Sequence, residues 1–237
     1  PRTFTDVILH PDRLDHPLRW RKPRRIFVNS MSDLFHKDVP DDFIDRIFDS
    51  MLEAPQHIYQ ILTKRPERMQ AWITQWLAPA LTEKMLENIW LGVSCEDQQR
   101  ADERIPLLLQ TPAAVRFVSL EPLLGPIDLR NILEIDRYLG KPDWIRSGWR
   151  PEVQWVIAGG ESGGPPERAL VEPAGKTVRG FQRAEFWQPK PEALEWVRSI
   201  RDQCVAAGVP FFFKQGSGPR PGMHTLLDGR EWKEMPA

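Results

Sequence analysis

The feature that most constrains the fold is a regular alternation of short apolar runs with helical patterns. Six runs have strand-like composition and end in polar or glycine residues. They are RIFVNSMSD (25–33), HIYQILTKRP (57–66), IWLGVSCED (89–97), RFVSLEPLL (116–124), WVIAGGESG (155–163) and PFFFKQG (210–216). Continuous apolar runs of this length are typical of strands that are buried on both faces of a parallel sheet.

Helical patterns lie between these runs, at 41–54, 66–78, 97–110 and 191–208. We expect the third of them to break near Pro106, since proline removes a backbone donor from a helix interior. Strands that alternate with helices predict a parallel sheet with right-handed crossovers. The fold class is therefore α/β, and the number of units suits a partial or closed (β/α) barrel. An open doubly wound sheet is the main alternative.

The length and composition fit one barrel domain over residues 1–237, in which 164–190 forms a long loop over the strand tips. No apolar run reaches membrane-spanning length, and the first residues lack the layout of a signal peptide. Two cysteines make a disulfide framework unexpected, so we predict a cytoplasmic protein. The net charge of −1 indicates no general attraction to nucleic acid or membranes, although RWRKPRR (19–25) is locally basic.

Ligands bind at the carboxyl ends of the strands in both parallel architectures. The candidate site residues share that place in the sequence, directly after an apolar run. Those assigned to a cofactor are Ser30, Ser32, Asp33, Ser94, Glu96, Ser119, Glu121, Gly159, Gly160 and Glu161. Those assigned to a substrate are Lys64, Arg65, Lys214 and Gln215.

Side chains alternate between the two faces of a strand, and this period of two sharpens the prediction. Cys95 shares a face with the apolar residues of its run, which should pack on helices. Ser94 and Glu96 lie on the opposite face, as do Ser119 and Glu121 on the next strand. We therefore expect these two Ser-x-Glu pairs to point toward the barrel axis and to converge with Glu161 on one pocket.

Simpler interpretations stay open for several of these residues. Asp33, Asp97 and Ser162 could be helix caps, and the glycines before Glu161 could serve a turn. Lys64 could contact an anion or pair with one of the glutamates. Both cysteines lie on apolar faces and are expected in the core, and they are too few and too far apart for a metal ligand set.

Several long motifs together resemble a known family. They are RRIFVNSMSDLFHKDVPDDFIDRIF, QILTKRPERM, NIWLGVSCEDQ, RFVSLEPLLGPIDL, WVIAGGESG, RDQCVAAGVPFFFKQ and LLDGREW. They occur in an uncharacterised family of phage and bacterial proteins that is similar to a divergent branch of the radical SAM superfamily. The resemblance covers nearly the whole chain and implies a partial (β/α) barrel with S-adenosylmethionine as cofactor.

The same resemblance implies three closely spaced cysteines that hold a [4Fe–4S] cluster, and this sequence departs from it there. It opens at a part of the family pattern that follows the cluster loop, so the chain is expected to be either a truncated product or a natural protein that lost its cluster. Without the thiolates there is no cluster, and we expect no radical chemistry from the chain as given. By resemblance, NSMSD would lie near the methionine end of the cofactor and GVSCED near its ribose. SLEPL and GGESG would lie near the adenine or the substrate.

Three functions follow as hypotheses. The first is a radical SAM-like enzyme of unknown substrate, seen without its cluster. The second is a non-catalytic barrel that binds a nucleotide-like small molecule or docks a protein partner at an exposed sheet edge. The third is a barrel enzyme that holds a hard cation between Glu96, Glu121 and Glu161.

Overall fold

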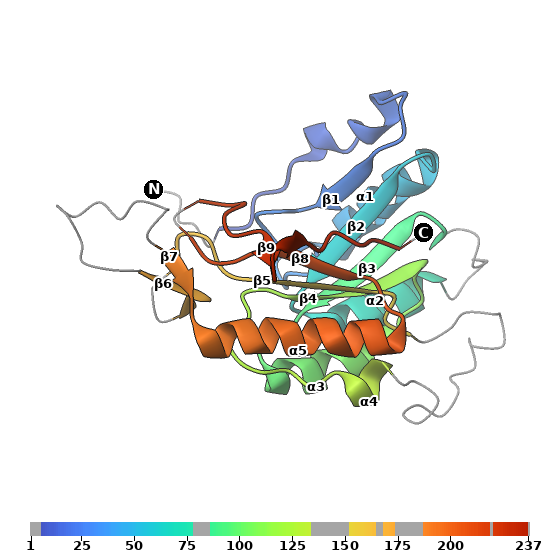
Figure 1. The fold of residues 1–237 in the computed structure, drawn as a ribbon. Helices are drawn as coiled ribbons and strands as arrows, with labels where there is room; N and C mark the ends of the chain where they lie inside the picture. Colours follow the sequence, from blue (N-terminus) through green and yellow to red (C-terminus); the bar gives the residue numbers. More distant parts are fainter. Residues whose placement is uncertain are drawn as a thin grey trace.

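The computed structural model describes residues 6–77, 86–133, 152–164, 168–173, 187–218 and 220–236. Its centre is a parallel sheet of six strands in the order β1-β2-β3-β4-β5-β8, curled into a half-barrel (Figure 1). The strands are β1 (Arg25–Val28), β2 (Ile58–Thr63), β3 (Ile89–Ser94), β4 (Val115–Leu120), β5 (Trp155–Gly159) and β8 (Phe211–Gln215). The predicted partial barrel with parallel strands is confirmed.

The connections between the strands run through the helices. These are α1 (Asp41–Glu53), α2 (Pro66–Leu77), α3 (Gln98–Leu109), α4 (Arg130–Leu133) and α5 (Pro191–Ala207). Figure 1 shows α3 and α5 along the convex side of the sheet, with α4 beside α5. The predicted break at Pro106 is wrong, because α3 continues to Leu109. Ile105, Leu108 and Leu109 are buried against the sheet, and this packing holds the last turn in place despite the missing donor.

Two hydrophobic clusters lie on the two sides of the sheet. The larger one fills the space between the sheet and the helices and contains Leu91, Val93 and Cys95. The smaller one lies on the concave side and consists of Trp90, Val115, Phe117 and Trp155, with Phe212 and Met235 packed against it. The period-two prediction therefore holds for β3, since the apolar face that carries Cys95 packs on the helices.

The two edges of the half-barrel differ. Along β8 the chain end adds an antiparallel segment, in which Lys233 bridges to Phe212 and the backbone N–H of Phe213 donates to the carbonyl of Trp232. This segment follows a hairpin of β9 (Leu226–Leu227) and β10 (Arg230–Glu231). At the other edge, β1 pairs only with β2 among the described residues. Docking of a protein partner there stays a prediction.

The predicted loop 164–190 lies partly outside the described residues. Within its described part, β6 (Val171–Pro173) pairs in antiparallel fashion with β7 (Trp187–Pro189), which leads into α5. Before β1, two short 3-10 helices, η1 (Pro11–Arg13) and η2 (Pro17–Arg19), carry the chain to the sheet. None of the helices in the described ranges is both long and apolar enough to cross a membrane.

Candidate functional site

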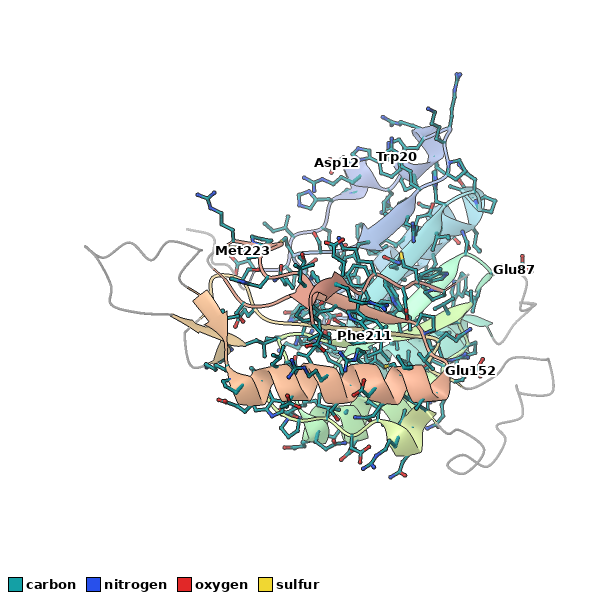
Figure 2. All side chains as sticks on the ribbon, in the orientation of Figure 1. Asp12, Trp20, Glu87, Glu152, Phe211 and Met223 are labelled. Carbon is teal, nitrogen blue, oxygen red and sulfur yellow. The ribbon has the colours of Figure 1, made fainter. Side chains whose placement is uncertain are left out.

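All six strands run in one direction, so their carboxyl ends meet at one end of the half-barrel, which we call the mouth. Figure 2 shows Glu87 and Glu152, which precede β3 and β5, at one end of the molecule. Met223, which follows β8, lies at the other end, toward the mouth. Ser94 and Ser119 occupy the mouth side by side, since they are register partners on β3 and β4, and both are buried.

Asp33, after β1, ties the tips of the first two strands together. Its Oδ1 accepts hydrogen bonds from the backbone N–H of Phe35 (2.9 Å) and from Thr63 Oγ1 (2.8 Å). Its Oδ2 accepts from the backbone N–H of Lys64 (3.1 Å) and from Arg65 Nη1 (2.6 Å). Four donors satisfy this carboxylate, so Asp33 fixes the loop geometry of the mouth.

Glu96, after β3, lies between two cations. Its Oε1 forms an ion pair with Lys64 Nζ, and its Oε2 accepts from Arg104 Nη1 at 3.1 Å. The same guanidinium donates to the carbonyl of Ser94 at 2.5 Å. Arg104 belongs to α3, so this pair of contacts also fastens the helix to the tip of β3. Of the two interpretations left open for Lys64, the structure shows the pairing with a glutamate.

Glu121, after β4, makes a second group of the same kind. Its Oε2 accepts from Ser119 Oγ at 3.1 Å and from Lys214 Nζ at 3.3 Å. Its other oxygen, Oε1, lies over Gly159, where a Cβ atom would stand only 2.7 Å from it. The first glycine of the Gly-Gly-Glu tip is therefore required by the carboxylate of the neighbouring strand.

The next glycine, Gly160, faces Ser217 instead. A Cβ atom there would lie 2.8 Å from the backbone nitrogen of Ser217 and would collide with its hydroxyl. Glu161 follows, and its Oε2 pairs with Arg168 Nη2 at 2.6 Å. The space beside both glycines is thus filled by Glu121 and Ser217, two parts of this chain.

The electrostatics link the strand tips across the mouth. Burial lowers the pKa of the Lys64 ammonium from its ordinary value, and the positive charge of Arg104 lowers it further. Asp33 and Glu161 act on the same ammonium in the opposite direction. Glu161 follows β5 and Lys64 follows β2, so the curl of the sheet brings residues from separated strands within electrostatic reach.

Three further residues predicted for the site, Ser30, Ser32 and Gln215, form no ion pair with the charged groups of the mouth among the described residues. Ser30 and Ser32 lie on the exposed turn after β1, where the backbone N–H of Ser32 donates to the carbonyl of Asn29. Gln215 is buried, and its Nε2 donates to Gly160 O (3.0 Å) and to Ser162 Oγ (2.6 Å). Gln215 therefore holds the backbone behind the mouth.

Sequence reasoning missed three contributors, namely Arg104, Arg168 and Ser217. Arg104 carried a usable signal, because it lies one residue before buried Ile105 in a helix that starts just after Glu96. A long cationic side chain at the edge of the apolar face of a helix can extend toward the end of the strand that precedes the helix. Arg168 and Ser217 lie in segments without periodicity, where the sequence held no comparable signal.

The described residues do not fit an iron–sulfur cluster. Cys95 and Cys204 are both buried and free, on β3's end and on α5, and burial raises the pKa of each thiol to about 12. A buried thiol of this kind is not a ready ligand. Within the described ranges, no group of three or more His, Cys, Asp or Glu side chains is arranged to hold a metal ion. The cofactor expectations therefore gain no support from the donor set.

In four ion pairs at the mouth the carboxylate is more buried than the cation, whereas Arg104 is as buried as Glu96, its partner. The Glu96 side chain is 14% exposed, whereas that of Lys64 is 50% exposed. Glu121 is 17% exposed, whereas Lys214 is 54% exposed. Arg65 and Arg168 are likewise more exposed than the carboxylates they contact. The mouth presents donors and positive charge to solvent, and the carboxylates hold these groups in place.

Residues 2–179 and 187–236 match the model of a family described as protein of unknown function (DUF5131), and the chain belongs to this family. No curated protein and no solved structure matches the chain.

Proposed function

We propose that this member of the DUF5131 family binds a small anionic ligand of the nucleotide class at the mouth of the half-barrel. The observation that carries the proposal is the order of the ion pairs, in which half-exposed cations stand outside carboxylates that are mostly buried. A phosphate group can take hydrogen bonds from Lys64 and Lys214 without displacing a buried charge. Charge-assisted bonds of this kind are the strong ones in recognition sites.

The nucleotide class follows from the polar groups beneath the cations. Glu96 and Glu121 are acceptors that suit ribose hydroxyls, and Ser94 and Ser119 add hydroxyl groups between them. The resemblance to radical SAM proteins points to the same class of molecule, because S-adenosylmethionine contains an adenosine. Both lines of reasoning favour the tip of β3 as the position of the sugar.

The more specific proposal, that the ligand is S-adenosylmethionine, agrees less well with the positive charges at the mouth. The sulfonium and ammonium groups of this molecule outweigh its carboxylate, so it carries net positive charge toward a cationic surface. The resemblance implies that the adenine or the substrate lies beside Gly159 and Gly160. In this structure, Glu121 and Ser217 occupy the space beside these two glycines. We therefore expect adenosine monophosphate to bind more tightly than S-adenosylmethionine.

Isothermal titration calorimetry tests the proposal with adenosine monophosphate, S-adenosylmethionine and S-adenosylhomocysteine. We expect the monophosphate to bind best, and expect Lys64→Gln and Lys214→Gln each to weaken its binding by about tenfold, the loss of one charge-assisted contact. Lys22→Gln is the control, since Lys22 is an exposed lysine before β1, at the end of the strands opposite the mouth. Absence of monophosphate binding, or equal losses in the control, would refute the proposal. If S-adenosylmethionine binds more tightly than the monophosphate, the proposal of an anionic ligand is wrong and S-adenosylmethionine becomes the proposed ligand.

A further inference from the structure

The basic stretch RWRKPRR plays no part in the mouth. It leads into β1 at Arg25, so it lies at the amino end of the parallel strands, which is the end opposite the mouth. Figure 2 shows Trp20 on the N-terminal segment that projects above β1. Five of the seven residues 19–25 are Arg or Lys and none is acidic, in a chain whose net charge is −1.

The central cations of this stretch are exposed and have no acidic partner among the described residues. Arg21 and Lys22 form no ion pair with any residue in the described part of the chain, whereas Arg19 lies 3.7 Å from Asp15. The guanidinium of Arg24 lies over the ring of Trp20, 4.6 Å from its centroid. An exposed guanidinium that is stacked on an indole keeps its outer face and its donors available.

The backbone of the stretch is fixed rather than left as a free tail. His57 is fully buried, its Nδ1 accepts from the backbone N–H of Arg24 (3.2 Å), and its Nε2 faces the carbonyl of Pro17 (3.0 Å). With Nδ1 as acceptor, the ring proton sits on Nε2 and donates to Pro17. The side chain of Gln56 also donates to the carbonyl of Trp20 (3.3 Å). Gln56 and His57, directly before β2, thus bind the backbone near both ends of the basic stretch.

We propose that residues 19–25 form a binding surface for single-stranded nucleic acid. Arg21 and Lys22 would contact phosphates, and the stacked pair of Arg24 and Trp20 would offer a flat platform for a base. Stacking on aromatic and guanidinium planes together with backbone phosphate contacts is how proteins bind single strands without sequence preference. A preformed surface also lowers the ordering entropy that binding costs.

Fluorescence anisotropy with a labelled oligothymidine of about 12 nucleotides tests this surface, because single-strand site sizes fall in this range. The two phosphate contacts, from Arg21 and Lys22, predict a slope of about −1.4 for the logarithm of the affinity against the logarithm of salt concentration. The double variant Arg21→Gln/Lys22→Gln should bring the slope close to zero. The control Arg100→Gln/Arg130→Gln removes the same charge from exposed ion pairs on α3 and α4 and should leave the slope unchanged.

A second oligonucleotide separates stacking from simple charge. An abasic strand of equal length should bind the wild type more weakly than oligothymidine, and Arg24→Lys, which keeps the charge but loses the plane, should reduce that difference. Lys64→Gln/Lys214→Gln should leave oligonucleotide binding intact, which keeps this surface distinct from the mouth. No binding at about 50 mM salt, an equal effect of the control variant, or binding to phosphatidylserine vesicles without binding to the oligonucleotide would overturn the proposal.

Discussion

The concave face of the half-barrel has two ends that are built in opposite ways. At the amino end, which we call the floor, aromatic side chains of Trp90, Phe117 and Trp155 pack on one another, with ring centroids of Phe117 and Trp155 5.7 Å apart. At the mouth, the same strands carry Glu96 and Glu121 in ion pairs with half-exposed lysines. Burial of apolar surface stabilises the floor, whereas ion pairs at the boundary with solvent stabilise the mouth.

The difference assigns separate roles to the two ends. Burial of a large aromatic ring contributes several kcal/mol, whereas an exposed ion pair contributes about 0–1 kcal/mol. The floor should therefore carry the stability of the concave face. The side chains at the mouth can therefore be substituted, or can form contacts with a ligand, with little loss of stability.

The largest expected effect is at the floor. Phe117→Ala removes a fully buried ring that contacts Trp155 and covers Gly92. It should lower the free energy of unfolding by about 3–5 kcal/mol, measured by urea denaturation. A loss below about 1 kcal/mol would contradict the separation of roles, since surface changes fall in that range.

A methyl group added at the floor should cost less. A Cβ atom at Gly92 would collide with the ring of Phe117, so Gly92→Ala should lower the free energy of unfolding by about 1–3 kcal/mol through overpacking. In a Phe117→Leu background, the same substitution should cost less, because the smaller side chain leaves room. Urea denaturation of the four proteins gives the coupling, and strictly additive losses would show that the ring and the glycine are independent.

The mouth should show the reverse pattern. Lys64→Met and Lys214→Met each remove a half-exposed cation, and each should change the free energy of unfolding by no more than about 1 kcal/mol. Binding of adenosine monophosphate to the same proteins should fall by about tenfold. Thermal unfolding and calorimetry on one preparation give both values. A large loss of stability with unchanged binding would show that these lysines stabilise the fold and do not bind the ligand.

The smallest expected effect is a dependence on pH. Because the pKa of Lys64 is lowered, its ammonium loses charge at a lower pH than an ordinary lysine does. Binding of adenosine monophosphate should therefore begin to weaken at pH values below the ordinary lysine pKa, as Lys64 loses its charge. Lys64→Arg keeps its charge and should flatten this decline in calorimetric titrations. An identical pH profile for both proteins would exclude Lys64 from the site.

Much of the fold could be predicted from the sequence, because buried parallel strands leave a strong apolar signal. The period of two also predicted that Cys95 lies on the helix-facing side of its strand, and the structure agrees. The end of α3 was missed, since local chemistry at Pro106 counted for more in the prediction than the tertiary packing of the turn that follows it.

The strand-tip positions of the candidate residues could be predicted from the sequence, but their pairing could not. The sequence placed Lys64, Glu96 and Glu121 at strand tips, but it could not show which cation reaches which carboxylate. Arg104 reaches Glu96 from a helix, and Lys214 reaches Glu121 from a strand 93 residues later in the chain. Such contacts depend on how the sheet curls. The role of Gly159, which makes room for Glu121, depends on the same curl.

Hydrogen–deuterium exchange with saturating adenosine monophosphate tests the central claim most directly, because it locates the ligand on the half-barrel. The account predicts protection in peptides that cover the strand tips at 62–65, 94–97, 119–122 and 212–215, and unchanged exchange in the basic stretch at 19–25. The variant Lys64→Gln/Lys214→Gln should lose this protection. Protection confined to the basic stretch, or to the groove between α4 and α5 that Leu133, Ser199 and Ala206 line, would contradict the claim that the mouth is the binding site.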